Sequence, residues 1–357
     1  MGMQTMTTQT GRLNKFKGGI YKNASVVEIL AKQGRQVTMP QNSSDTYVGR
    51  RYLPYGAAST NANTINRFYA DGTGDRANVV VQAHQTTEGV TGVPETISAV
   101  DTTVVIVEYS CLYGFTNKMF QLYEDDVPAE MKKIVGQRVA WVNELIVYGA
   151  LRGCTNQYFA GGTTIATVAS APSLSLLRKV AKNLKANHAM VITRMLAASP
   201  KYATEPVGQG YIVVAHTNLE PDISDIPGFV PIEKYSSGTP MPNEIGKVGA
   251  FRFVLSPDLP ELQDAGASGA TNGLYCTTST TAVDVYPMIV MAEDAYSQVA
   301  VRGLAGLEPT YLPPNKKDKA DPHGQRGYAG TLWKKAVMIE NNGWMAVVFV
   351  GSKILTT

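Results

Sequence analysis

Residues 126–152 carry the strongest helical pattern in the chain, and this segment most constrains the fold. Three carboxylates lie at its start: Glu124, Asp125 and Asp126. Pro128 suits the first turn, and Arg152 suits the last turn because its charge complements the helix dipole. A broad apolar face follows the helical repeat. About 26 residues at 1.5 Å each give roughly 39 Å, long enough to form the backbone of a flat subunit.

Strand-like segments flank this helix on both sides. They are rich in β-branched and aromatic residues and lie at 101–117, 163–170, 211–218, 250–259, 284–296 and 329–351. Residues 173–187 form a second, amphipathic helix with Ser173 or Ser175 as its N-cap. Strands and helices do not alternate regularly, so the pattern predicts an α+β fold. We expect Trp344, in the closing strands, to lie in the core.

Residues 46–100 are rich in Thr, Asn, Gly and Ala and contain few large apolar side chains. Fifty such residues do not make a core, and long segments of this kind are often functional arms. Aromatic residues recur at Tyr52, Tyr55, Phe68 and Tyr69, which argues against compositional disorder. We therefore expect an extended, hairpin-like projection that docks on another surface. Residues 1–45 are polar and would form a mobile arm unless a neighbour tied them down.

The composition narrows the classes of function. Hydrophobic residues make up 44% of the chain and charged residues only 17%, which suits a protein that hides surface against copies of itself. A net charge of +3 is small for a protein that binds nucleic acid by neutralising phosphates. Cys111, Cys154 and Cys276 are far apart and predict free thiols. No apolar run approaches the length of a membrane span, and no secretory signal is visible at the start.

Three glycines near the end of the chain, Gly324, Gly327 and Gly330, resemble a phosphate-binding loop at first sight. Such a loop needs a preceding strand, a following helix and a different glycine spacing. The residues upstream are instead a charged loop, and a strand pattern follows. We interpret the glycines as turn residues, with Arg326 among them holding a loop or a subunit contact.

A second candidate site combines one histidine with carboxylates within ten residues: His216, Glu220, Asp222 and Asp225. These residue types can bind a divalent metal, but their spacing matches no standard set of ligands. The alternative is a histidine at a strand end, followed by a helix whose first turn is acidic. A catalytic triad need not be local in sequence, so a soluble two-domain enzyme with a scattered site remains an alternative.

Whole segments of the chain resemble the major capsid protein family of the "N-four" type podophages. The resemblance covers roughly residues 86–350. Its most specific parts are "EIGKVGAFRFVLSPDL" and the closing "DPHGQRGYAGTLWKKAVMIENNGWMAVV". It implies the Hong Kong 97-type capsid fold, with these parts: an N-terminal arm (1–45), an extended loop (46–100), a peripheral domain (101–172) with a spine helix (126–152), an axial domain (173–300) and closing peripheral strands (301–357).

The resemblance also implies a function. Copies of the chain would assemble as hexamers and pentamers into the icosahedral head of a tailed phage, made in the host cytoplasm. The implied partners are other copies, a portal protein, a decoration or cement protein, and packaged double-stranded DNA bound without sequence specificity. No membrane, catalytic site, cofactor or metal is implied. An encapsulin-like compartment shell is the alternative with the same fold.

Under this resemblance, the candidate subunit contacts are basic, aromatic and acidic residues of the extended loop, the helix start and the closing block. They are Arg50, Arg51, Tyr52, Tyr55, Arg67, Phe68, Tyr69, Glu124, Asp125, Asp126 and Arg326.

Overall fold

The computed structural model describes residues 28–40, 44–53, 85–91, 97, 99–123, 126–192, 210–234, 240–268, 273–277, 282–301, 308–317 and 319–354. These residues divide into two compact units. The first unit takes the described residues within 1–47, 105–149 and 298–337, and the second takes those within 48–104, 150–297 and 338–357.

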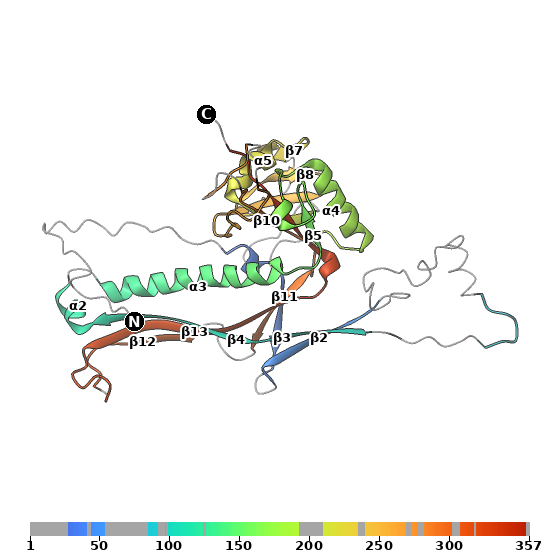
Figure 1. Ribbon diagram of the computed structural model, residues 1–357. Helices are drawn as coiled ribbons and strands as arrows, with labels where there is room; N and C mark the ends of the chain where they lie inside the picture. The colour runs from blue at the N-terminus through green and yellow to red at the C-terminus, as the bar shows by residue number, and fades with distance from the viewer. Residues whose placement is uncertain are drawn as a thin grey trace. The chain divides into compact units, whose positions relative to one another are not determined.

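The first unit is a long helix lying along a five-stranded sheet (Figure 1). The helix α3 (Val127–Arg152) begins within one residue of its predicted start, and the side chain of Asp126 accepts a hydrogen bond from the Ala129 N–H at 3.2 Å. The strands follow the order β1 (Arg35–Met39), β11 (Tyr296–Val301), β13 (Arg326–Ile339) and β12 (Glu308–Leu312), and β4 (Val107–Thr116) also pairs with β13. The short helix α2 (Asn117–Leu122) follows β4.

The pair of strands β4 and β13 is the base on which α3 packs. The two strands run antiparallel from Arg326 opposite Thr116 to Lys335 opposite Val107. The buried side chains between helix and sheet include Val135, Val139, Cys111 and Trp333. The Trp333 indole N–H donates to Asn143 Oδ1 at 3.0 Å, so the polar edge of this buried ring is satisfied by α3.

The second unit is built on a seven-stranded sheet. Its order is β5 (Gln157–Phe159), β14 (Met345–Val350), β10 (Tyr286–Met291), β6 (Tyr211–His216), β9 (Phe251–Ser256), β8 (Glu244–Val248) and β7 (Phe229–Pro231). β6 and β9 are parallel, as are β5 and β14, whereas the other described pairs are antiparallel. All residues of β9, β10 and β14 are buried, which explains the continuous apolar sequences of β10 and β14. The strand β9 also carries Arg252, whose guanidinium pairs with the buried carboxylate of Glu244.

Two helices of the second unit, α4 (Leu174–Ala186) and α5 (Glu220–Ser224), accompany this sheet. Among the described residues of both units, the short 3-10 turns are η1 (Leu30–Lys32), η3 (Ile165–Thr167), η4 (Thr217–Leu219), η5 (Ile232–Lys234) and η6 (Asn342–Trp344). A separate two-stranded sheet pairs β2 (Thr46–Tyr52) with β3 (Ala99–Val105). The mixture of helices with parallel and antiparallel strands confirms the α+β prediction.

One predicted strand, at 163–170, is wrong. The segment instead contains η3, and the Thr167 hydroxyl accepts hydrogen bonds from the N–H groups of Thr163 and Thr164, each at 2.9 Å. Threonine favours strands, but its hydroxyl can also satisfy nearby backbone donors and so favour a turn. The strand predicted at 101–117 is confirmed, although it is split between β3 and β4.

The prediction of three turn glycines is right for Gly324 and wrong for the other two. Gly324 has a φ of +65° and lies in a turn. Gly327 and Gly330 lie inside β13, where no side chain fits. A Cβ on Gly327 would lie 2.5 Å from the Phe115 ring, and one on Gly330 would lie 2.5 Å from the Cys111 carbonyl oxygen.

The prediction that Trp344 lies in the core is also wrong. Trp344 is only partly buried at the end of η6, and its indole N–H donates to the Asn187 carbonyl at 3.0 Å. Trp333, at 4% exposure, is the tryptophan of the core.

Candidate functional site

The strand β2 lies in the predicted extended loop (46–100), of which residues 46–53, 85–91, 97, 99 and 100 are described, and it pairs with β3, which begins at the end of that range (Figure 1). None of the residues in either strand is buried. Val48 is 52% exposed and Tyr52 66% exposed, and Ile97, just before β3, is 80% exposed. Two strands alone are marginally stable in water, so such a pair is stabilised when another surface covers it. This ribbon is therefore a candidate contact surface.

A bidentate ion pair joins the two strands of this ribbon. Arg50 Nε and Nη2 donate to the two carboxylate oxygens of Asp101 at 2.7 and 2.8 Å. The hydrogen bonds raise the pKa of Arg50 above its ordinary range and lower the pKa of Asp101. Both side chains are exposed, so the pair orients the strands more than it stabilises them.

The other candidate contact residues have different surroundings. Burial lowers the pKa of Arg51, and the charge of Glu340 partly offsets that effect. Asp126 caps α3. The Arg326 N–H donates to Asp321 Oδ2 at 2.8 Å, and the Arg326 side chain is exposed at the start of β13. Six candidates lie outside the described residues: Tyr55, Arg67, Phe68, Tyr69, Glu124 and Asp125. A role in subunit contact stays a prediction for all eleven.

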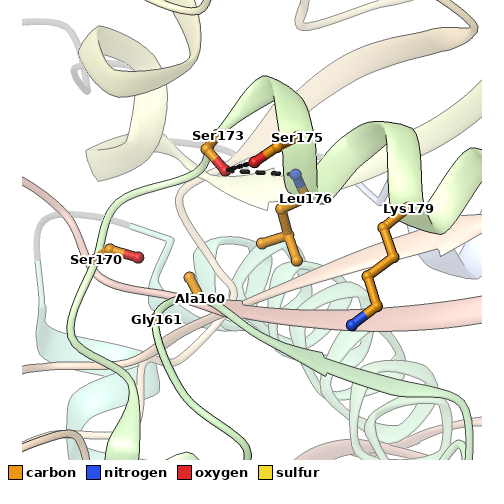
Figure 2. Close-up of a pocket in the computed structure, with 7 residues that line it drawn as sticks. All are labelled: Ala160, Gly161, Ser170, Ser173, Ser175, Leu176 and Lys179. Atoms are coloured by element: carbon orange, nitrogen blue, oxygen red, sulfur yellow. Dashed lines mark hydrogen bonds between the residues drawn. The ribbon is translucent and has the colours of Figure 1, made fainter.

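A shallow pocket of about 270 Å³ lies at the start of α4 (Figure 2). Its lining is Ala160, Gly161, Ser170, Ser173, Ser175, Leu176 and Lys179. Ser173 Oγ accepts from the Leu176 N–H at 3.4 Å and lies 3.1 Å from Ser175 Oγ, so it caps the helix as predicted. The lining contains no histidine or carboxylate that could act as a general base for these serines.

The structure confirms the capping interpretation of the histidine and carboxylate cluster. His216 ends β6, and its Nδ1 accepts from the Asn218 N–H at 3.0 Å, capping η4. Burial lowers the pKa of His216, and nearby Glu261 opposes that effect. Asp222 accepts from the Lys353 N–H at 3.0 Å. Within the described residues, no three His, Cys, Asp or Glu side chains are placed to hold a metal ion.

Sequence reasoning missed a tie between the N-terminal segment and α3. The N–H groups of Ile29, Leu30 and Ala31 donate to the Glu144 carboxylate at 3.2, 2.8 and 2.9 Å. Gln298 Nε2 adds a hydrogen bond to the Ala31 carbonyl at 2.9 Å. Glu144 is fully buried, and in the sequence it directly precedes the apolar run 145–148 of α3, a signal that could have marked it. The described end of the predicted arm is thus anchored within its own unit.

No protein-family model matches the chain. The major capsid protein of Pseudomonas phage KPP21 is 26% identical over 165 residues, which cover 44% of this chain and 41% of that protein. The chain thus spans less than half the length of this curated relative.

Solved phage capsid structures match almost the whole chain. The capsid of Ralstonia phage GP4 has a TM-score of 0.58 at 10% identity, covering 98% of this chain and 100% of that one. The capsid of cyanophage P-SCSP1u has a TM-score of 0.57 at 12% identity, with 98% and 97% covered. The head of Helicobacter pylori bacteriophage KHP40 has a TM-score of 0.57 at 12% identity, with 98% and 100% covered.

These likenesses establish the fold. The chain has the α+β, Hong Kong 97-type fold of phage capsid proteins. Within the described residues, no helix has the length and apolar composition needed to cross a membrane.

Proposed function

We propose that this chain is a phage major capsid protein and that its copies assemble into the shell of the virion. The observation that carries the proposal is the likeness to three phage capsid chains along 98% of its length. The ribbon of β2 and β3 supports it, because a strand pair with no buried residue needs a second surface. The low charged fraction of 17% fits a protein that covers much of its surface with copies of itself.

The mechanism would be assembly rather than catalysis. One surface of each copy would bind a different surface of the next, and such contacts form a closed shell only when the rotations between neighbours close. The ordering of a long polar loop against a neighbour costs entropy, which the buried contact area must offset. The chain would need no cofactor and would act as a structural protein.

The finer parts of the proposal follow the sequence resemblance. They comprise the "N-four" podophage type, hexamers and pentamers, a tailed phage with double-stranded DNA, a portal protein and a decoration or cement protein as partners, and the division into arm, extended loop, peripheral and axial domains. Two alternatives to the capsid function stand beside it. One is a compartment shell with the same fold that encloses enzymes, and the other is a soluble two-domain enzyme with a scattered site.

Assembly of the full chain tests the proposal directly. The chain is expressed, its mass is measured by light scattering, and the particles are imaged. Closed particles or rings are expected. A persistent monomer that turns over a substrate would contradict the proposal. Particles that contain a protein cargo would favour the compartment alternative.

A pair of variants tests the role of the ribbon. Val48→Asp with Tyr52→Asp adds two charges at exposed positions, so the fold should survive while assembly is lost. The control, Gln263→Asp with Ser268→Asp, adds two charges at exposed positions elsewhere and should assemble normally. Normal shells from the ribbon variant would show that β2 makes no essential contact.

A further inference from the structure

The helix α4 (Leu174–Ala186) has two faces of opposite character. Leu177, Val180 and Leu184 are buried against the second unit. The exposed side carries four basic residues: Arg178, Lys179, Lys182 and Lys185. The 13 residues of the helix include no aspartate or glutamate, so nothing on the helix itself neutralises these charges.

The four basic side chains also lack carboxylate partners elsewhere in the described chain. Among the described residues, no ion pair involves a residue of α4. Lys179 Nζ lies 5.8 Å from the centroid of the Tyr158 ring, at the outer limit of a cation–π contact. Within the part of the chain that the structure describes, the helix therefore presents a face of four positive charges without a carboxylate partner.

The size of this face suits a strand of phosphates. From residue 178 to residue 185, a helix rises about 10 Å at 1.5 Å per residue. Duplex DNA carries one negative charge per roughly 1.7 Å of its axis, so about six charges lie within that length. Three of the four cations are lysines, whose compact charge on a flexible stem binds phosphate without reading base edges.

We propose that the basic face of α4 is the surface through which this chain contacts the phosphate backbone of duplex DNA, without sequence specificity. The proposal rests on the proposed capsid function, because a shell that encloses a genome holds DNA at high local concentration. It is compatible with the net charge of +3, since the contact is weak for one chain and repeated over many copies. The small net charge of the whole chain does not reveal this local cluster of four basic residues on α4.

The experiment measures binding of the full chain to a labelled 30-bp duplex by fluorescence anisotropy. Two unrelated sequences are compared at salt concentrations from 50 to 200 mM. If α4 neutralises up to four phosphates, a slope of about −0.9 per phosphate predicts an affinity loss of up to roughly 150-fold across this range. The two sequences should bind equally.

A charge-matched pair of variants isolates the helix. The α4 variant replaces Arg178, Lys179, Lys182 and Lys185 with glutamine, and it should lose most of the salt dependence. The control replaces four exposed lysines elsewhere with glutamine: Lys234, Lys316, Lys317 and Lys319. It changes the net charge equally and should keep the wild-type slope. Glutamine is a good helix former, so α4 should persist, and circular dichroism checks this.

The outcomes separate this proposal from the proposed function. Equal slopes for the α4 variant and its control would overturn the role of α4, and so would a wild-type chain that does not bind the duplex at 50 mM salt. Binding of polyglutamate in place of the duplex would assign the face to an acidic protein surface instead. Light scattering follows assembly separately, so a chain that forms shells but fails these tests loses only this inference. If the fourfold variant misfolds, Arg178→Gln with Lys182→Gln repeats the comparison.

Discussion

Replacing Gly327 with alanine tests whether the glycines of β13 are required by packing. A Cβ at this position would lie 2.5 Å from two atoms of the Phe115 ring and 3.0 Å from a third. The ring cannot move aside easily, because Phe115 is fully buried against Met131 and Ala329. Forcing an extra methyl group into a packed core costs about 1–3 kcal/mol. We expect Gly327→Ala to lose about 2 kcal/mol of unfolding free energy within that range.

The matched control is Gly136→Ala, because Gly136 lies on α3 and a Cβ there would have no atom within 4 Å apart from its chain neighbours and the backbone of its own helix. Alanine is the better helix former by about 1 kcal/mol, so this variant should be more stable than the wild type. Both variants add one methyl group to the first unit, yet their effects should have opposite signs. Urea unfolding of the unassembled chain, followed by circular dichroism, measures both differences.

Two outcomes would refute this reasoning about Gly327. One is a Gly327→Ala chain as stable as the wild type, which would mean that Phe115 has room to shift. The other is a loss of equal size in Gly136→Ala, which would mean that the flexibility of glycine matters rather than the space it leaves.

Three further predictions concern the other buried contacts. Trp333→Ala should lower the free energy of unfolding by about 3–5 kcal/mol, because it leaves a cavity in the core. Trp344→Ala, at a half-buried site, should lower it distinctly less. Equal shifts of the urea midpoint in the two variants would contradict this difference in burial. Glu144→Ala should lower the free energy of unfolding by about 2–4 kcal/mol, because two buried backbone N–H groups lose their acceptor. Amide hydrogen exchange at residues 29–31 should also accelerate. Unchanged exchange would show that the hydrogen bonds to Glu144 are dispensable. Burial raises the pKa of Glu144 above its ordinary 4.5, so the folded chain binds this proton more tightly than the unfolded chain does. Its contribution to stability should therefore fall as pH rises from about 4.5 through the folded pKa, and Glu144→Gln should remove this slope in unfolding experiments across pH.

The parts of the fold that depend on local sequence were predictable. The helix at 126–152 follows from its apolar periodicity, and the Ser173 cap follows from capping chemistry. Both signals act between residues that are only a few positions apart in the sequence. In the second unit, the largely apolar segments predicted β6, β9, β10 and β14, whereas the short strands β5, β7 and β8 were not predicted. The strand predicted at 163–170 failed because the preference of threonine for strands competed with its ability to bond to nearby backbone groups, and the latter prevailed.

Contacts between distant parts of the chain were not predictable in this way. Glu144 and Leu30 are 114 residues apart, and Arg50 and Asp101 are 51 apart. No local pattern connects such pairs. Gly327 was predicted to be a turn residue, because the local sequence does not show why it must be small. The reason is the ring of Phe115 on the neighbouring strand β4, which leaves no room for a side chain. The basic face of α4, in contrast, is local and visible in the sequence as four basic residues at helical spacing.

The structure separates the residues that determine folding from those expected to determine assembly. In the second unit, all residues of β9, β10 and β14 are buried, and in the first unit α3 packs on β4 and β13 through buried side chains. Residues of one chain thus bury one another in both cores. The ribbon of β2 and β3 is different, since it buries none of its residues. Substitution of Gly327 should therefore change the unfolding free energy of the single chain, whereas charges at Val48 and Tyr52 should leave it unchanged and act only when copies meet. If the ribbon variant instead unfolded at lower urea than its control, the ribbon would belong to the folded core of the single chain, and the contact surface would have to lie elsewhere.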